Sequence, residues 1–546
     1  MATQSNMMTQ SLPWYRTWLG ALGISVVLPP LGFILVWMRP FKAGVMRILM
    51  GLAGRLALSA LLAILTLTYL VRLGFLHVEA SGAGIIPIFS TIDPKADQDA
   101  LEKHRAQMST ATPPPAAASV PADASAAATA PAVTAPASAA PDSAPKREAA
   151  PAAAARAYWS DFRGPNRAGV YAETPLLAAW PADGLKPLWK QPVGGGYASF
   201  VVAGGVAFTI EQRRGNEVVA AYDLRSGREL WTNAWAALFS ESMGGDGPRA
   251  TPVWHEGKLY ALGATGEFRC LDAATGKVIW SKNILSDNRA TNVEWGMANS
   301  PLIVDDMVIV TPGGRSEGRS VVAYNKLTGD RVWGALDDKA AYASPMLANL
   351  AGERQMLIVT AKRLAGLRPE TGELLWDFPW VTMYDTNSAQ PIAVDGEHVF
   401  ISAGYDHGSA LVKIAKGERG YSATPVWENR NLKNRFNSSV LHDGHIYGFD
   451  ESIFACIDAR TGERKWKAGR YGYGQALLAT GGGPARIIVI TESGDLVLVD
   501  PSPAELKELA RFSALEGKTW NHPALAEGIL LVRNTREMAA FDLRAK

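Results

Sequence analysis

The sequence predicts an all-β fold, an eight-bladed β-propeller, preceded by an N-terminal two-helix transmembrane hairpin and an Ala/Pro-rich linker. Three observations lead to this prediction: two apolar runs near the N-terminus, a stretch built largely of Ala and Pro, and a repeat of 39 to 53 residues in the rest of the chain. The length of 546 residues alone would suggest several domains. The repeat instead assigns residues 158–546 to one ring.

Residues 1–76 are expected to form the membrane hairpin. The run 18–38 contains no charged residue and the run 56–76 contains only Arg72, and each is 21 residues long. That length is enough to cross about 30 Å of hydrocarbon. The segment between the runs carries Arg and Lys but no acid, so the positive-inside rule places it in the cytoplasm and the rest of the chain outside. The alternative is a buried apolar hairpin of a soluble domain.

Residues 77–157 are expected to be a spacer that continues into a disordered linker. Within 111–155, Ala and Pro occupy 31 of 45 positions, and frequent Pro blocks the helix that Ala favours. Before this stretch, Asp93–Gln107 could form one short helix. A flexible coil of the linker's length spans roughly 35–40 Å, which would hold the domain that follows away from the bilayer.

The repeat in residues 158–546 places an Asp, then a Thr-Gly turn, then a Trp at the end of each unit. The clearest copy is Cys270-Leu-Asp-Ala-Ala-Thr-Gly-Lys-Val-Ile-Trp280. Asp272 can accept backbone N–H bonds within the turn, and Gly276 can take the positive φ that a tight hairpin needs. The closing Trp is large enough to fill the wedge between two blades. Further copies end at Trp231, Trp333, Trp376 and Trp466, and looser ones at Trp427 and Phe512.

Ring closure is predicted from the two ends of the repeat region. The last unit, 520–544, lacks a final strand, and Lys186–Lys190 ends like a unit that has no beginning. If this segment completes the last unit, the ring has eight blades and no open sheet edge. Cys270 and Cys456 would then lie in blades two and six, on opposite sides of the ring. They are too far apart for a disulfide and are expected to be buried small hydrophobes.

The Asp-x-x-Thr-Gly-x-x-x-Trp frame resembles the repeat of pyrroloquinoline-quinone (PQQ) type propellers, the quinoprotein alcohol dehydrogenase-like superfamily. The opening Trp159-Ser-Asp-Phe-Arg-Gly-Pro-Asn-Arg-Ala-Gly-Val170 resembles the start of the bacterial PQQ-binding-like β-propeller repeat proteins. The resemblance covers 158–546 and implies an eight-bladed propeller. Together with the hairpin it implies the cytoplasmic (inner) membrane of a bacterium, with the propeller in the periplasm. The family contains both dehydrogenases and non-enzymatic scaffolds such as BamB, so it does not choose between them.

In propellers of this family, the ligand face carries the loops that join the last strand of one blade to the first strand of the next. The polar and aromatic residues of these loops are the candidates for binding a cofactor or ligand: Arg249, Trp295, Asn299, Tyr384, Asn387, Arg435, Asn437, Tyr473, Trp520, Asn521 and His522. For PQQ with Ca²⁺, Glu294 is a weak candidate for a metal ligand and Asp385 for the base that takes the alcohol proton. Alternatively, these side chains only satisfy backbone groups of the crowded inner strands.

Two functions compete. The first is a membrane-anchored extracytoplasmic propeller that acts as a non-catalytic, BamB-like scaffold, with a protein partner on the loop face. The alternative is a PQQ- and Ca²⁺-dependent membrane-bound dehydrogenase that oxidises an alcohol or sugar and passes electrons to quinone. The sequence favours the scaffold, because it lacks the adjacent-cysteine pair of alcohol-oxidising quinoproteins and any Cys-x-x-Cys-His haem site. The net charge of +2 gives no basic excess for binding nucleic acid.

Overall fold

The computed structural model describes residues 45–72, 77–81, 84–88, 94–110, 158–241 and 243–545. The predicted span 18–38 and the Ala/Pro-rich linker lie outside these residues. The chain separates into two compact units, of which the second comprises Ala100–Phe239 and Gly247–Lys546. The second unit contains the propeller.

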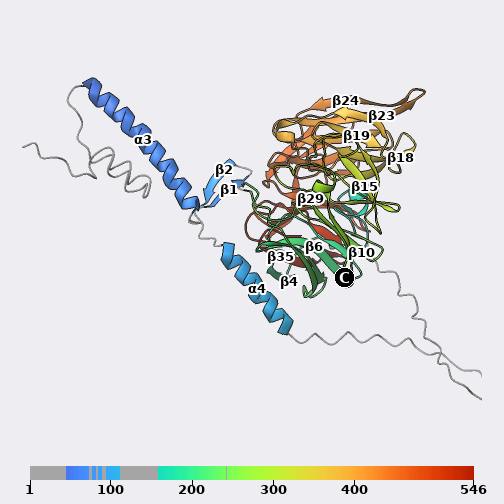
Figure 1. The fold of residues 1–546 in the computed structure, drawn as a ribbon, viewed down its shortest axis with the longest axis horizontal. Coiled ribbons are helices and arrows are strands. Elements are labelled where there is room, and N and C mark those ends of the chain that lie inside the picture. Colours follow the sequence, from blue (N-terminus) through green and yellow to red (C-terminus); the bar gives the residue numbers. More distant parts are fainter. Residues whose placement is uncertain are drawn as a thin grey trace, which may run out of the picture. The chain divides into compact units, whose positions relative to one another are not determined.

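The N-terminal unit contains one long helix and a small sheet (Figure 1). Helix α3 (Val45–Arg72) begins before the predicted span 56–76 and ends earlier, so Arg47 and Arg55 lie in the helix and not in a loop. Strands β1 (His77–Ser81) and β2 (Gly84–Ile88) pair antiparallel in the segment that was expected to be a spacer. None of the helices in the described part of the chain is long and apolar enough to cross a membrane.

Helix α4 (Pro94–Thr110) confirms the short helix expected before the linker. Its residues from Ala100 onward belong to the second unit and contact the propeller. Leu101 is buried, and Arg105 pairs with Glu229 at 2.7 Å. The helix therefore covers part of the last strand of the first blade.

Eight blade sheets, seven with four strands and one with five, confirm the predicted propeller. Blade 1 comprises β5 (Val201–Ala203), β6 (Val206–Arg213), β7 (Asn216–Asp223) and β8 (Glu229–Ala236), and blade 2 comprises β9 (Val253–His255), β10 (Lys258–Leu262), β11 (Glu267–Asp272) and β12 (Val278–Asn283). Blade 3 comprises β13 (Leu302–Val304), β14 (Met307–Val310), β15 (Val321–Asn325) and β16 (Arg331–Ala335), and blade 4 comprises β17 (Met346–Leu350), β18 (Glu353–Val359), β19 (Arg363–Leu367) and β20 (Leu374–Pro379).

Blades 5 to 8 repeat the arrangement. Blade 5 comprises β21 (Ile392–Ala393), β22 (His398–Ala403), β23 (Gly408–Gly417) and β24 (Gly420–Asn429), and blade 6 comprises β25 (Val440–His442), β26 (His445–Asp450), β27 (Ile453–Asp458) and β28 (Arg464–Arg470). Blade 7 comprises β29 (Gln475–Ala479), β30 (Arg486–Ile490), β31 (Asp495–Asp500) and β32 (Lys507–Ser513), and blade 8 comprises β33 (Ala524–Ala526), β34 (Ile529–Arg533), β35 (Glu537–Asp542) and β4 (Pro187–Pro192). Three short helices lie in the connections: η2 (Pro165–Arg167), α5 (Ile284–Asp287) and η3 (Met383–Asp385).

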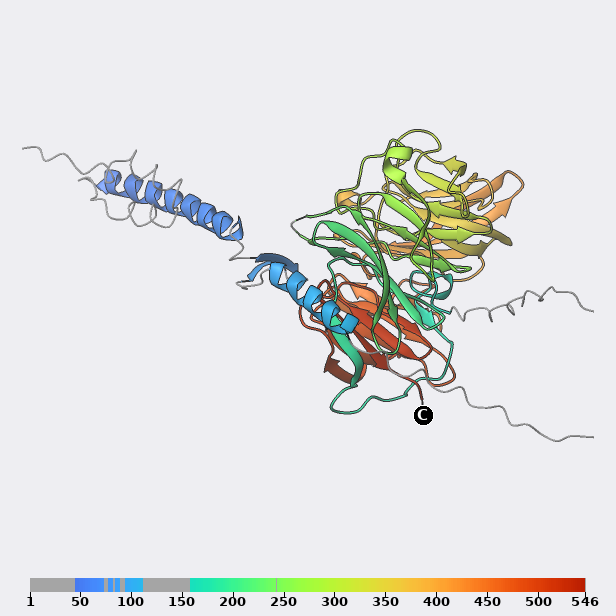
Figure 2. The same ribbon diagram turned by 60° about the horizontal axis from the view of Figure 1, so that its bottom comes forward.

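The ring closes as the sequence predicted. Strand β4 pairs antiparallel with β35, and the two lie side by side in Figure 1. First strands of successive blades contact one another, as β5 and β9 do, so they are the innermost strands. Figure 2 shows the C-terminal strands of the ring beside the first strands of the propeller. Strand β3 (Val170–Tyr171) adds to blade 7 by pairing parallel with β29.

The Asp, Thr-Gly and Trp residues of the blade motif make the predicted contacts. Asp272 accepts hydrogen bonds from the backbone N–H and hydroxyl of Thr275, and Gly276 has a φ of +70°. Trp231, which closes blade 1, packs on Gly276 and donates its indole N–H to Ala273 O at 3.0 Å. Each closing Trp of this kind thus covers the turn of the next blade.

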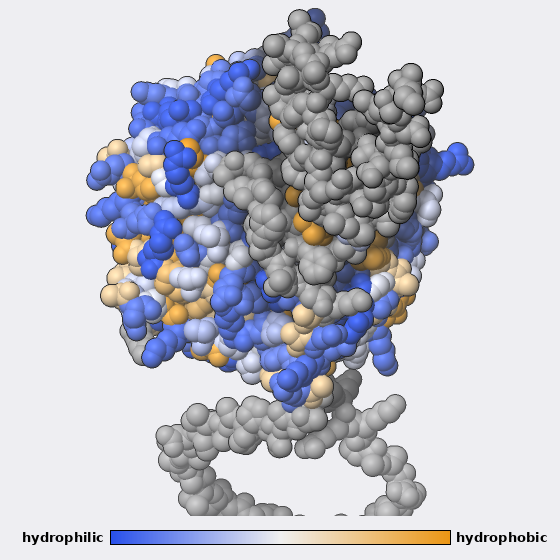
Figure 3. All heavy atoms as spheres, turned by 90° about the vertical axis from the view of Figure 1, so that its left-hand side faces the viewer, coloured by the Kyte–Doolittle hydropathy of each residue, from blue (hydrophilic) through white to orange (hydrophobic). Residues whose placement is uncertain are grey.

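The core of the propeller lies between neighbouring blades. One apolar cluster joins blades 2 and 3 through Tyr260, Phe268 and Tyr324, and similar clusters fill the other wedges. Cys270 and Cys456 are free and buried in β11 and β27, as expected. On the face drawn in Figure 3, hydrophobic residues form small patches among hydrophilic ones.

Candidate functional site

Aromatic side chains on the loop face contact one another across blade boundaries. The ring of Trp520 stacks on Tyr197, with 5.5 Å between centroids, and lies 4.5 Å from the ring of Phe436. Phe436 in turn lies 4.9 Å from Tyr473. The structure therefore brings the candidates Trp520 and Tyr473 together through Phe436. Phe436 lies in the same predicted loop as the candidates Arg435 and Asn437, but it was not itself among the candidates.

Two arginines of the same face each lie between two aromatic rings. The guanidinium carbon of Arg435 is 4.1 Å from the ring centroid of Tyr405 and 4.9 Å from that of Tyr473. That of Arg249 is 4.5 Å from Phe239 and 5.6 Å from Tyr197. Contacts of this kind hold a cation over the faces of aromatic rings.

Electrostatics keeps the pair Arg435 and Tyr473 in its ordinary charge state. Burial lowers the pKa of Arg435, but the phenol groups of Tyr405 and Tyr473 outweigh it and raise the pKa. Burial also raises the pKa of the Tyr473 phenol, to which Arg435 donates a hydrogen bond. Arg435 therefore carries a permanent positive charge on this face and does not act as a general acid.

The four candidate asparagines are buried, and three of them donate hydrogen bonds to backbone carbonyl oxygens. Asn299 donates to Ala343 O at 2.6 Å, and Asn521 donates to Ala198 O at 2.9 Å. Asn387 and Asn437 are also buried, with Asn387 donating to two carbonyl oxygens. Asn437 instead accepts a hydrogen bond from Arg435 N, and its Nδ2 has no hydrogen-bond partner in the described part of the chain.

The metal and base candidates do not meet. Glu294 is exposed on the loop before blade 3, whereas Asp385 lies before blade 5 and pairs with Lys339 at 2.7 Å. Trp295 lies 5.8 Å from Tyr342, and Tyr384 lies 5.6 Å from Tyr405. Within the described ranges, no three His, Cys, Asp or Glu side chains are grouped so that they could hold a metal ion.

The last candidate, His522, contacts a segment that the sequence did not place. Its ring lies 5.1 Å from Phe162, in the motif that opens the propeller region. Burial, assisted by the charge of Arg163, lowers the pKa of His522 well below its ordinary value. The imidazole is therefore neutral at pH 7.

Residues 159–171, here named the axial segment, contact seven of the eight blades. Arg163 donates to Ser439 O at 2.8 Å, and Arg167 donates to Pro345 O at 2.7 Å. Further contacts join the segment to Val202, Trp254, Ser300, Leu478 and His522. A segment that reaches the inner strands of nearly every blade must lie in the central channel.

The backbone of the axial segment is strained. Arg163, Asn166 and Arg167 have φ values of +59°, +55° and +58°, a conformation that costs about 1–2 kcal/mol per non-Gly residue. Gly164 and Gly169 also have positive φ, and a Cβ at Gly169 would collide with the Arg163 guanidinium. Such strain persists only where the surroundings fix the conformation. The Gly-Pro-Asn motif thus folds tightly enough to fit inside the ring.

The loop face and axis do not fit PQQ with Ca²⁺. A flat cofactor held at the centre of the ring would have to share the channel with the axial segment, whose Phe162 packs on the candidate His522. Asp385, the candidate base, is bound to Lys339, and Asn299 and Asn521 already hold backbone carbonyls. The candidate base and the amide nitrogens of Asn299 and Asn521 therefore already have partners.

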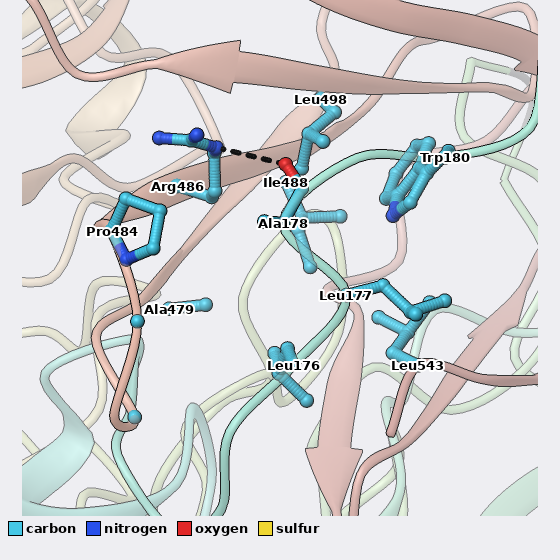
Figure 4. A pocket seen from close by; sticks show the side chains of 12 residues that line it. Leu176, Leu177, Ala178, Trp180, Ala479, Pro484, Arg486, Ile488, Leu498 and Leu543 are labelled. Atoms are coloured by element: carbon cyan, nitrogen blue, oxygen red, sulfur yellow. Dashed lines mark hydrogen bonds between the residues drawn. The ribbon is translucent and has the colours of Figure 1, made fainter. Parts of the chain in front are cut away.

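A small cavity beside blades 7 and 8 is a gap in the packing. Leu176, Leu177 and Trp180 cover it, and Arg486 donates to Ala178 O at 3.3 Å (Figure 4). Its volume of about 20 Å³ is enough for about one water molecule. It has no room for a ligand.

Comparisons with known proteins point to one superfamily. The family described as "Outer membrane protein assembly factor BamB" matches residues 215–468. The protein of that name from Burkholderia pseudomallei (strain K96243) is 24% identical over 339 residues, which cover 59% of this chain and 79% of that protein. The quinohemoprotein alcohol dehydrogenase of Comamonas testosteroni is 31% identical over 123 residues, which cover 21% of this chain and 16% of the enzyme. The crystal structure of BamB from Moraxella catarrhalis aligns with a TM-score of 0.45 at 16% identity, covering 66% of this chain and 99% of that one.

Proposed function

We propose that this chain, whose ring belongs to the PQQ-like β-propeller superfamily, is a membrane-anchored extracytoplasmic scaffold that binds a protein partner on its loop face. The proposal takes its direction from the similarity to an outer membrane protein assembly factor over 79% of that protein's length. It does not require a catalytic residue. The side chains of the loop face serve here to shape and hold a binding surface.

An exposed apolar loop between blades 4 and 5 is the observation that carries the proposal. Val381, Met383 and Tyr384 are 63%, 57% and 61% exposed. Tyr384 has a φ of +64°, which is uncommon for a bulky residue. Burying these side chains would gain hydrophobic free energy that the fold leaves unused.

The base of this loop is rigid, which suits a docking surface. Trp380 is buried, and Asn387 donates to Thr360 O and to Trp380 O. Thr382 donates its hydroxyl hydrogen to Asn387 at 2.9 Å. A loop that is already ordered loses little conformational entropy when a partner binds.

Membrane anchoring and a periplasmic location at the inner membrane of a bacterium are part of the proposal. Helix α3 exposes large apolar side chains, including Leu56, Leu61 and Ile64. Together with the uncharged run 18–38, these side chains supply the apolar surface that a membrane anchor needs. The Arg and Lys residues between the two runs favour a cytoplasmic position for that segment.

A photo-crosslinking amino acid at Val381 tests the scaffold proposal in cells. Val426 on β24 is 50% exposed and provides a matched control on an outer strand. We expect a discrete adduct from position 381 that is absent from position 426 and weakened by Met383→Asp. Equal adducts from both positions, or none from 381, would contradict a partner on this loop.

A dehydrogenase is the second candidate, because one relative with 31% identity over 123 residues is an alcohol dehydrogenase. Purified protein is mixed with PQQ, Ca²⁺ and a redox dye in the presence of alcohols or sugars. The scaffold proposal expects no dye reduction above that of a heat-denatured sample. Substrate-dependent reduction would establish the enzyme instead.

A further inference from the structure

A cavity of about 510 Å³ lies between the axial segment and the inner strands of blades 4, 5 and 6. Met346, Ile392 and Leu441 of β17, β21 and β25 form an apolar part of its wall. This volume lies within the usual range for pockets that hold small organic molecules. The cavity follows the inner strands and is distinct from the exposed loop at Tyr384.

The polar part of the wall is cationic. Arg163, Arg167 and Arg354 line the cavity, and none of the described lining residues is acidic. Arg167 pairs with Asp161 at 2.8 Å, and Arg354 pairs with Asp305 at 2.6 Å. Two of the three guanidinium charges are thus already neutralised from outside the cavity.

Arg163 is the third charge, and it has no counter-ion among the described residues. Arg163 is only 3% exposed, and its N–H groups donate only to carbonyl oxygens such as Ser439 O. Burial lowers the pKa of Arg163 to about 9, so the group stays charged at pH 7. A buried charge without a partner is costly unless an anion compensates it.

The side-chain oxygen of Gln390, also at the cavity, lacks a hydrogen-bond donor in the described part of the chain. Gln390 is buried and lines the cavity, and its amide nitrogen donates to Ser344 O at 2.7 Å. Its Oε1 has no hydrogen-bond partner within the described part of the chain. An open acceptor in the same cavity wall as the guanidinium groups suits a ligand that carries a hydroxyl or N–H donor as well as an acid group.

We propose that this cavity is a binding site for a small organic anion, a carboxylate with a short apolar body. The carboxylate would face the Arg163 end of the wall and the apolar body would pack along β17, β21 and β25. The strained conformation of the axial segment places Arg163 there. The site takes a ligand that the loop face does not, and it is independent of the protein partner proposed above.

Calorimetric titration of the full chain with sodium hexanoate tests the site, with hexan-1-ol and inorganic phosphate as comparison probes. Hexanoate should bind, and the alcohol and the phosphate should each bind at least about tenfold more weakly. The alcohol lacks the charge, and the phosphate lacks the apolar body. Equal affinity for hexanoate and hexan-1-ol, or no hexanoate binding at millimolar concentration, would overturn the proposal.

Two cavity variants and one control variant test whether hexanoate binds in this cavity. Ile392→Trp should fill the cavity and abolish hexanoate binding, whereas the matched Val426→Trp on the outer strand β24 should leave it unchanged. Arg354→Gln removes the charge that neutralises Asp305 and leaves that carboxylate unpaired beside the cavity, so it should weaken hexanoate binding several-fold. Circular dichroism checks that each variant is folded, and unchanged affinity in folded Ile392→Trp would place hexanoate elsewhere and refute the site.

Discussion

The contact between Trp189 and the turn of blade 1 can be tested with two glycines of the same blade. Gly227 has a φ of +73°, and a Cβ there would lie 2.7 Å from Cδ2 of Trp189. Gly205 has the same φ of +73°, but a Cβ there would meet nothing within 4 Å. Both substitutions to Ala carry the cost of positive φ, about 1–2 kcal/mol. Only Gly227→Ala also crowds the wedge between blades 8 and 1.

We expect Gly227→Ala to lower the free energy of unfolding by about 1–3 kcal/mol more than Gly205→Ala, the usual cost of overpacking a core. Urea denaturation of the full chain, followed by circular dichroism, measures the difference between the two midpoints. Equal losses in the two variants would mean that Trp189 does not press on the turn. The motif would then be a local hairpin signal and not a wedge between blades.

Three further predictions concern pH, closure and topology. Burial raises the pKa of Glu217 to about 7 from 4.5, so the folded chain holds a proton that the unfolded chain releases. Stability should therefore fall by about 3 kcal/mol as pH rises between these values, and Glu217→Gln should flatten this decline in thermal melts. Truncation after Arg536 removes β35, so β4 should become sensitive to limited proteolysis; continued protection of Lys190 would argue against closure. An alkaline phosphatase fused to the C-terminus should be active, and an inactive phosphatase with a fluorescent cytoplasmic fusion would contradict an extracytoplasmic propeller.

The blades were predictable because their determinants are local. Asp272, Thr275 and Gly276 bond within one turn, so a short window of sequence contains the whole motif. Closure by Lys186–Lys190 was predictable for a related reason, since the last unit lacked a strand and only one segment could supply it. The structure pairs that segment with β35.

The loop face was only partly predictable, because its contacts join residues far apart in the chain. Trp520 and Tyr473 were candidates, but Tyr197 and Phe436, which contact Trp520, were not. The membership of Phe436 in a candidate loop was the one signal that could have found it. Nothing in the sequence indicates that Tyr197 stacks on a residue more than 300 positions away, because packing across the ring depends on closure.

The position of the axial segment in the channel could not be predicted from the sequence. Its motif was visible as a resemblance, but its place in the channel follows from Arg163 and Arg167 reaching carbonyl oxygens of distant blades. A ring whose channel holds its own backbone has less room for a cofactor at its centre. Exposed apolar side chains lie on the loop between blades 4 and 5, at Val381 and Met383. Because a docked protein needs an exposed surface while a cofactor needs an enclosed one, these loop side chains suit protein binding better than they suit a cofactor.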